Sequence, residues 1–239
     1  MYNTDYLKVS AERFAEQRKE FVMRTNIKIY VKDKISNNIK IENVLDMIST
    51  SIPSHLLSEV DSIYVGMFDD FKEKEISAAF KDGAIYVSNM QEDEQDLIDD
   101  LVHEVAHSLE AKYGFLIYGD DKLKSEFLIK RKKLFDILKS EELSPDKELF
   151  LDFEYSTLLD NYLYKTVGYD RLNFISASYG LFTSAYSATS LKEYYANGFE
   201  YYFLENPKEL SDICPELYKK IEELHYYEDW KIWINQKRR

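Results

Sequence analysis

The sequence is poor in cysteine, glycine and proline, and each shortage excludes a class of protein. The single cysteine, Cys214, among 239 residues leaves no partner for an internal disulfide, which excludes a disulfide-stapled secreted fold. Seven Gly and four Pro are too few for a collagen-like or linker-like chain. The apolar runs are also far shorter than the ~20 residues of a membrane-spanning helix, so we expect no contact with a membrane.

What is present is an acidic, aromatic chain. Asp and Glu total 44 against 31 Lys and Arg, a net charge of −13, which argues against nucleic acid as a partner. The basic run 130–133 is interpreted as a solvated helix face. Residues 1–20 interleave charges with apolar side chains and contain no signal-peptide core. We therefore expect a cytoplasmic protein, whose 45% hydrophobic residues suffice for a substantial core.

Strand and helix patterns alternate up to about residue 115. Alternating apolar residues predict strands at 26–31 and 62–68, and an amphipathic helix is expected at 41–50. Residues 76–80 and 84–88 predict a hairpin, because Asp82-Gly83 in the connection Lys81-Asp82-Gly83 favours the positive φ angles of a tight turn.

Beyond residue 115 helical periodicity dominates. Helices are expected at 122–140, 145–167, 190–204 and 215–231. The sequence therefore predicts an α+β class, with a mixed N-terminal lobe (1–115) and a helical C-terminal lobe (116–239) that together form one catalytic domain.

The most specific motif is His-Glu-Val-Ala-His at residues 103–107, an H-E-x-x-H pattern. On a helix, positions i and i+4 lie one above the other, so both imidazoles can bind one Zn²⁺. Glu104 is then expected to accept a proton from water rather than to bind the metal. The motif predicts one zinc ion per chain.

A helical wheel places the motif on an amphipathic helix. One broad apolar stripe is expected to face the core, and His103 and His107 lie nearly opposite it. The stripe comprises Leu97, Ile98, Leu101, Val102, Val105, Ala106 and Leu109. Asp96, Asp100 and Glu110 fall on or beside the histidine face, so that face is polar and is expected to line a cleft.

A hydrolytic zinc site needs a third protein ligand, and the residues alone leave its identity open. No histidine follows the motif closely, so His55, His225 and several downstream carboxylates are the alternatives. These carboxylates are Glu110, Glu154, Glu193, Glu200 and Glu205. Glu193 also has a purely structural interpretation, because Ser190-Leu191-Lys192-Glu193 is a capping box at a helix start.

The segment TSAYSATSLKEYYANGFEYYFL at 183–204 resembles the downstream motif of the anthrax lethal factor catalytic domain and its relatives, which include the secreted Pro-Pro endopeptidases. HEVAHSLEAKYG and KKLFDILKSEE (132–142) are similar to further stretches of that family, and the resemblance covers roughly residues 84–225. It implies a zincin-like zinc metallopeptidase in which Glu193 is the third metal ligand and Tyr186, seven residues earlier, stabilises the oxyanion. Asn197 stands where the family has an acid beside the ligand, and residues 144–179 form an apparent insertion.

The resemblance also implies a substrate-binding strand before the metal helix. Such peptidases bind an extended peptide on a sheet edge, so Ala78, Ala79 and Phe80 are expected to contact substrate, Phe80 in a side-chain pocket.

The predicted function is a zinc endopeptidase acting on a peptide or protein substrate, and the acidic helix face favours a basic one. The alternatives are a catalytically silent metallopeptidase-like domain that binds a protein, and a zinc hydrolase acting on a non-peptide amide. A monomer is expected.

Overall fold

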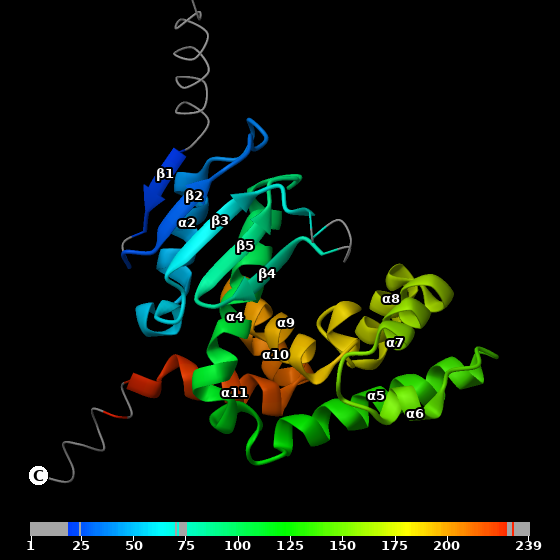
Figure 1. The fold of residues 1–239 in the computed structure, drawn as a ribbon. Coiled ribbons are helices and arrows are strands. Elements are labelled where there is room, and N and C mark those ends of the chain that lie inside the picture. Colours follow the sequence, from blue (N-terminus) through cyan, green and yellow to red (C-terminus); the bar gives the residue numbers. More distant parts are fainter. Residues whose placement is uncertain (1–18, 24, 70, 72–75, 229–230, 232–239) are drawn as a thin grey trace, which may run out of the picture. The chain divides into compact units, whose positions relative to one another are not determined.

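The computed structural model describes residues 19–23, 25–69, 71, 76–228 and 231, and these form two compact units (Figure 1). The first unit is Met1–Ser108 and the second is Leu109–Arg239. The described strands all belong to the first unit, and the second contains helices. The protein is therefore a mixed α and β structure, as the α+β prediction requires.

The first unit contains a five-stranded mixed sheet in the order β1-β2-β3-β5-β4. Its strands are β1 (Lys19–Val22), β2 (Lys28–Val31), β3 (Ser62–Gly66), β4 (Ala78–Lys81) and β5 (Ala84–Ser88). β2, β3 and β5 run parallel, whereas β1 and β4 pair antiparallel at the two ends. The predicted strands within 26–31 and 62–68 are confirmed; β1 was not predicted.

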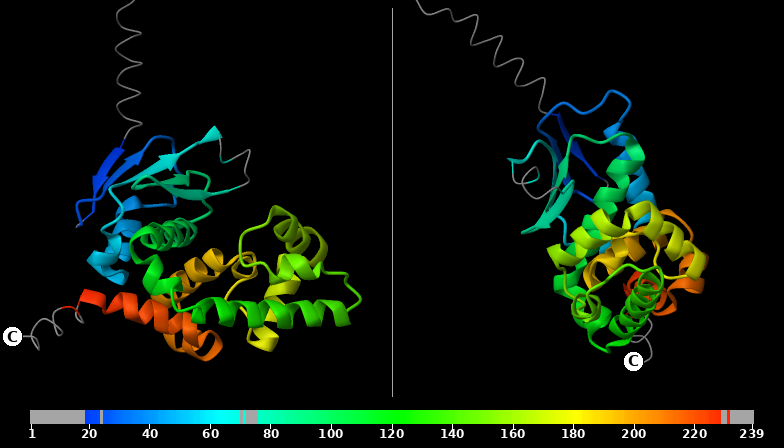
Figure 2. Two further views of the ribbon diagram at one scale, coloured as in Figure 1. Left: turned by 60° about the horizontal axis from the view of Figure 1, so that its bottom comes forward. Right: turned by 90° about the vertical axis from the view of Figure 1, so that its right-hand side faces the viewer.

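The two faces of this sheet differ because side chains alternate along each strand. Ile29, Ile63 and Ile85 are buried on one face, towards which α2 (Ile41–Ser51) also turns buried side chains. Tyr30, Tyr64 and Tyr86 lie in register on the other face, where their rings stack in a ladder with centroids 5.1 and 5.3 Å apart. Figure 2 shows the helices of this unit gathered on one side of the strands.

The predicted hairpin is confirmed as β4 and β5. Asp82 and Gly83, with φ of 50° and 80°, make the two-residue connection, so Lys81 belongs to the strand instead of the turn. A side chain on Gly83 would be strained by that φ and would also meet the Asp61 carboxylate. β4 is the last strand on its side of the sheet among the described residues.

The metal-motif helix α4 runs from Glu94 to Tyr118 without interruption and passes the boundary between the two units. All seven residues of its predicted apolar stripe are at most 4% exposed. The wheel therefore identified the buried face of this helix correctly.

The second unit is built around α9 (Leu191–Leu204), which contacts α5, α10, α11 and the short turn η3. Tyr194, Tyr195 and Phe199 of α9 are fully buried, and Gly198 lets α11 approach so closely that a Cβ there would collide with Leu217. The other helices of this unit are α5 (Lys122–Ser140), α6 (Lys147–Leu151), α7 (Thr157–Asn161), η2 (Tyr162–Val167), α8 (Tyr169–Tyr179), η3 (Tyr186–Ala188), α10 (Pro207–Ile213) and α11 (Pro215–His225).

Two expectations for this unit are wrong. The predicted helix at 145–167 is broken at 152–156, where the Asp152 side chain bonds the Glu154 amide and Asp152 O and Leu149 O accept from Arg131. The basic run 130–133 does not form a solvated face as a whole, because Lys130 is 8% exposed and Arg131 is fully buried, whereas Lys132 and Lys133 are exposed. Helices α8 and α10 were not predicted.

Within the described residues, no helix combines the length and the apolar character needed to cross a membrane.

Candidate metal centre

Helix α4 presents both histidines of the motif from one side. His103 and His107 are half-buried, and their Nε2 atoms lie 3.2 Å apart. Two ligand atoms ~2.05 Å from one tetrahedral zinc ion are separated by about 3.3 Å. The observed spacing of the two nitrogens therefore matches what a single zinc ion requires.

Asp100 lies one turn before His103 and fastens this part of α4 to the hairpin. Its carboxylate accepts hydrogen bonds from Ser77 Oγ (3.1 Å) and Gln91 Nε2 (2.8 Å). Burial raises the pKa of Asp100, while these two hydrogen bonds and His103 oppose the rise. Because Ser77 directly precedes β4, the edge strand and the histidine-bearing turns are linked within the first unit.

Glu193 completes a group of three potential metal ligands. One ligand atom from each of His103, His107 and Glu193 lies within 4.8 Å of the others, and all three side chains are half-buried. No other such group of His, Cys, Asp and Glu occurs in the described part of the chain. Two imidazoles and a carboxylate could hold a metal ion.

The start of α9 holds Glu193 in place. Ser190 caps the helix by accepting a hydrogen bond from the Glu193 amide at 3.2 Å, which confirms the predicted cap. The neighbouring Lys192 forms an ion pair of 3.0 Å with Glu110, which lies on α4 beyond the histidines. Within the second unit, the first turn of α9 therefore lies against α4.

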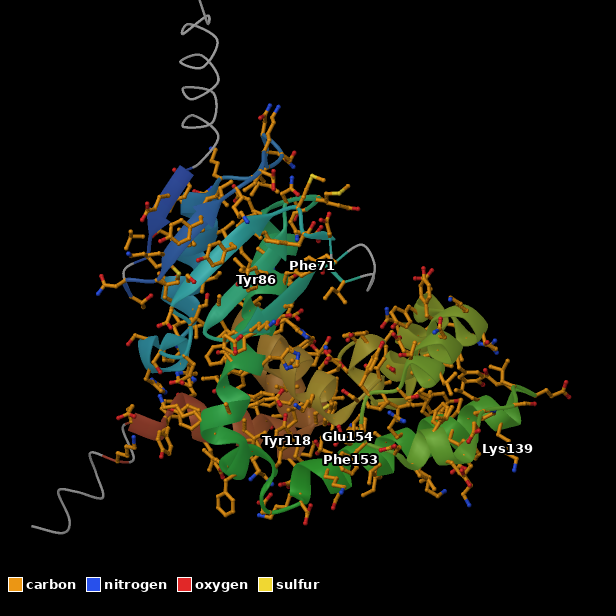
Figure 3. All side chains as sticks on the ribbon, viewed as in Figure 1. Phe71, Tyr86, Tyr118, Lys139, Phe153 and Glu154 are labelled. Carbon is orange, nitrogen blue, oxygen red and sulfur yellow. The ribbon has the colours of Figure 1, made fainter. Side chains whose placement is uncertain are left out.

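Glu193 and two further acids, Glu110 and Glu154, lie within electrostatic range of Tyr118 in the second unit. The pKa of Tyr118 is raised mainly by burial, and further by the charges of Glu110, Tyr195, Glu193 and Glu154. Figure 3 labels Tyr118 and Glu154, which come from α4 and from the break before α7. This concentration of negative charge favours the binding of a divalent cation.

Tyr186, the predicted oxyanion residue, begins the turn η3 and is half-buried. The turn is held by hydrogen bonds from Thr189 Oγ1 to Tyr186 O (2.8 Å) and from the Ala185 amide to Asn173 Oδ1 (2.6 Å). The pKa of Tyr169 is raised mainly by burial. The hydrogen bond and charge of Asp160 raise it further, and the charge of Tyr186 adds a smaller effect. Tyr186 therefore lies within electrostatic range of Tyr169.

Asn197 bonds both the backbone of Glu193 and Ser184, which lies before η3. Its Nδ2 donates to the backbone oxygen of Glu193 at 2.9 Å, and its Oδ1 accepts from Ser184 Oγ at 2.6 Å. Ser184 in turn contacts Ser187 Oγ at 3.0 Å. Asn197 thus joins the helix of Glu193 to the turn that carries Tyr186.

The predicted base, Glu104, is 7% exposed on α4, between the two histidines in sequence. The alternative ligands lie outside the three-residue group. His55 belongs to the short turn η1 (Ser54–Leu57), and His225 Nδ1 lies 3.1 Å from Tyr202 OH, with its imidazole stacked on Tyr226.

Among the described residues, the predicted substrate strand β4 has backbone groups that face away from its neighbour β5. Ser77 O accepts a hydrogen bond from the Ser88 amide, so Ser77 is a hydrogen-bonded position of the β4-β5 ladder. Hydrogen-bonded and non-hydrogen-bonded positions alternate along an antiparallel pair. The amides and carbonyls of Ala78 and Phe80 therefore point away from β5. Ala78, Ala79 and Phe80 are half-buried. The strand can therefore accept a further strand at this edge.

The sequence interpretation missed Arg131. It lies on the apolar stripe of α5 with Phe127, Leu134 and Leu138, all fully buried, and that spacing is the signal that could have identified it as buried. Its guanidinium donates to Ala188 O (2.7 Å), Thr189 O (3.3 Å), Leu149 O (2.6 Å) and Asp152 O (3.2 Å).

No protein-family model, curated protein or solved structure matches this chain. The resemblance to the lethal factor type of peptidase therefore stays a prediction, based on the motifs themselves.

Proposed function

We propose that the chain is a zinc-dependent endopeptidase of the zincin type. The observation that carries this proposal is the His103, His107 and Glu193 group, whose ligand atoms lie within 4.8 Å of one another. Three protein ligands with a remaining position for water are the arrangement of catalytic zinc sites, whereas structural sites use four. The fold class and the free edge strand β4 are compatible with the same proposal.

A zinc ion held by His103, His107 and Glu193 would supply Lewis acidity, which would make water a stronger acid and polarise the substrate carbonyl. The Glu104 carboxylate accepts the proton of the attacking water and passes it to the leaving amine. Its position on α4 next to His103, and its near-complete burial, keep it close to the histidines and away from bulk solvent.

Tyr186 donates a hydrogen bond from its phenol to the oxygen of the attacked carbonyl as negative charge develops there. The hydrogen bonds around Ser184, Ser187 and Asn197 hold its turn before substrate arrives, so little reorganisation is needed. The backbone of Ala78 and Phe80 binds the peptide as an added strand, and the acids near Glu193 favour a basic substrate.

The substitution Glu104→Gln tests the proposal. We expect the variant to keep its zinc, because Glu104 is no ligand, and to lose about 10²- to 10⁴-fold in the rate of peptide hydrolysis, because the proton acceptor is gone. Elemental mass spectrometry measures the zinc content of each protein, and cleavage of a mixed peptide library measures the rate of hydrolysis. Wild-type turnover by Glu104→Gln would eliminate Glu104 as the base.

The same experiment separates the proposal from the alternative of a silent protein-binding domain. A silent domain would hold zinc in both proteins and cleave nothing in either.

A further inference from the structure

The apparent insertion, residues 144–179, is tied firmly to the start of α9. Arg131 binds two carbonyls of the insertion, Leu149 O and Asp152 O, and two carbonyls just before α9, Ala188 O and Thr189 O. The Leu191 amide also donates to Phe153 O at 2.8 Å. The break at 152–156 is therefore fixed beside the helix turn that carries Glu193.

Tyr155 lies in this break, two residues after Phe153, whose carbonyl accepts from the amide of Leu191, two residues before Glu193. Burial, the hydrogen bond and charge of Asp160, and the charge of Glu193 raise the pKa of Tyr155 to about 12. The phenol therefore lies within electrostatic range of the Glu193 carboxylate. Tyr155 nevertheless remains 50% exposed, so its ring is accessible to a ligand at this place.

Asp160 holds two tyrosines at once. Its Oδ2 accepts from Tyr155 OH at 2.7 Å and its Oδ1 accepts from Tyr169 OH at 2.8 Å. The Asp160 carboxylate therefore links Tyr155 in the break to Tyr169 in α8. Tyr155 lies within electrostatic range of Glu193, and Tyr169 within electrostatic range of Tyr186. With its hydroxyl occupied by Asp160, Tyr155 offers its ring face rather than a hydrogen bond.

We propose that Tyr155 is a specificity-determining residue that packs against an apolar side chain of the peptide substrate, and that Asp160 is the positioning residue that orients it. Leu151 and Leu158, on either side of Tyr155 in the sequence, are 48% and 71% exposed, so this segment of the insertion presents apolar side chains to solvent. Burying such a side chain against an aromatic ring is favourable in proportion to the apolar area removed from water. This inference rests on the proposed peptidase function.

The test compares cleavage of a random decapeptide library by the zinc-loaded full chain and by Tyr155→Ala, Asp160→Asn and Phe174→Ala. We expect the wild type to prefer an apolar residue at one position near the cleaved bond. Tyr155→Ala should lower kcat/KM about tenfold for those peptides, an amount that one aromatic contact can supply, and leave peptides with a small residue there unchanged. Asp160→Asn should cause a smaller loss with the same selectivity.

Phe174→Ala is the matched control, because it removes a 73% exposed ring from α8 of the same insertion. It should leave the preference intact. A merely structural role for Tyr155 would instead lower kcat/KM equally for every peptide.

A second readout does not depend on turnover. In the Glu104→Gln background, the affinity for the best library peptide, followed by fluorescence anisotropy, should fall about tenfold on Tyr155→Ala. Should Tyr155→Ala fail to fold by circular dichroism, Tyr155→Gln removes the ring with a smaller change of volume and decides the question.

An unchanged preference in a folded Tyr155 variant of an active wild type would overturn this inference and leave the proposed function standing. A zinc-loaded wild type that cleaves no peptide would overturn both.

Discussion

Glu193 lies in the first turn of α9, where the helix dipole and the Ser190 cap favour a carboxylate even without a metal. Glu193→Ala separates the two roles. Removing a residue that merely orients a ligand typically lowers metal affinity ~10- to 100-fold. If Glu193 binds the metal itself, we expect Glu193→Ala to lower zinc affinity by more than about 100-fold.

Competition with a chelating dye measures this zinc affinity. Glu200→Ala is the matched control, because Glu200 is half-buried on the same helix but outside the metal group. An unchanged zinc affinity in Glu193→Ala would show that Glu193 stabilises the start of the helix and does not bind the metal.

The residues of the metal helix could be predicted because helix periodicity alone determines which of them share a face. His103, His107 and the buried stripe follow from spacing within a single helix. The third member of the potential metal group could not be derived in this way, since Glu193 lies far along the chain from His107 and several carboxylates fit the sequence equally well. The resemblance to a peptidase family was needed to choose Glu193 among them.

At the scale of elements, Arg131 connects α5 to four carbonyls in two segments. Burial lowers the pKa of Arg131 to about 10, so it stays charged at neutral pH. Arg131→Met would leave these carbonyls without their charged donor, and an unsatisfied buried polar group costs about 1–3 kcal/mol. We expect the free energy of unfolding to fall by at least about 3 kcal/mol.

Urea unfolding checks this expectation, with Lys132→Met as the control. Lys132 is the next residue of α5. Its side chain is 66% exposed and forms a surface ion pair with Asp136. Its removal should change stability by less than about 0.5 kcal/mol. Equal effects of the two substitutions would show that the carbonyl contacts of Arg131 contribute little.

The same contacts explain why the elements around 145–167 were predicted wrongly. Apolar periodicity is continuous through this segment, but Arg131 binds Leu149 O and Asp152 O from another helix. Such long-range hydrogen bonds leave no local sequence pattern.

The hairpin was predicted correctly because Asp82-Gly83 determines its turn locally. Strand β1 was missed because it has only four residues, with too little alternation of apolar and polar side chains to be recognised.

At the scale of the whole molecule, the 20 tyrosines should divide into two classes at alkaline pH. Burial raises the pKa of Tyr194 and Tyr195 well above 10, and Tyr201 reaches about 12 through burial and its hydrogen bond to Glu209. A phenol with a raised pKa contributes stability that is complete below its unfolded pKa of about 10 and is lost as the pH rises through its folded pKa.

We therefore expect the free energy of unfolding to fall from about pH 10 upwards. The native protein should show a tyrosine fraction that ionises only near pH 12 or on unfolding. Absorbance at 295 nm, recorded against pH, follows the ionisation of the tyrosines. Urea unfolding midpoints at each pH measure the change in stability. Ionisation of all tyrosines in one native step near pH 10 would contradict this account.

The central claim is that His103, His107 and Glu193 hold a zinc ion with which the chain cleaves peptides. The most direct measurement is hydrolysis of a mixed peptide library by the full chain before chelation, after zinc removal and after zinc is restored. The account predicts cleavage at about one zinc per chain, loss of cleavage in the zinc-free protein and recovery when zinc is added. Full activity in a preparation without zinc would contradict it.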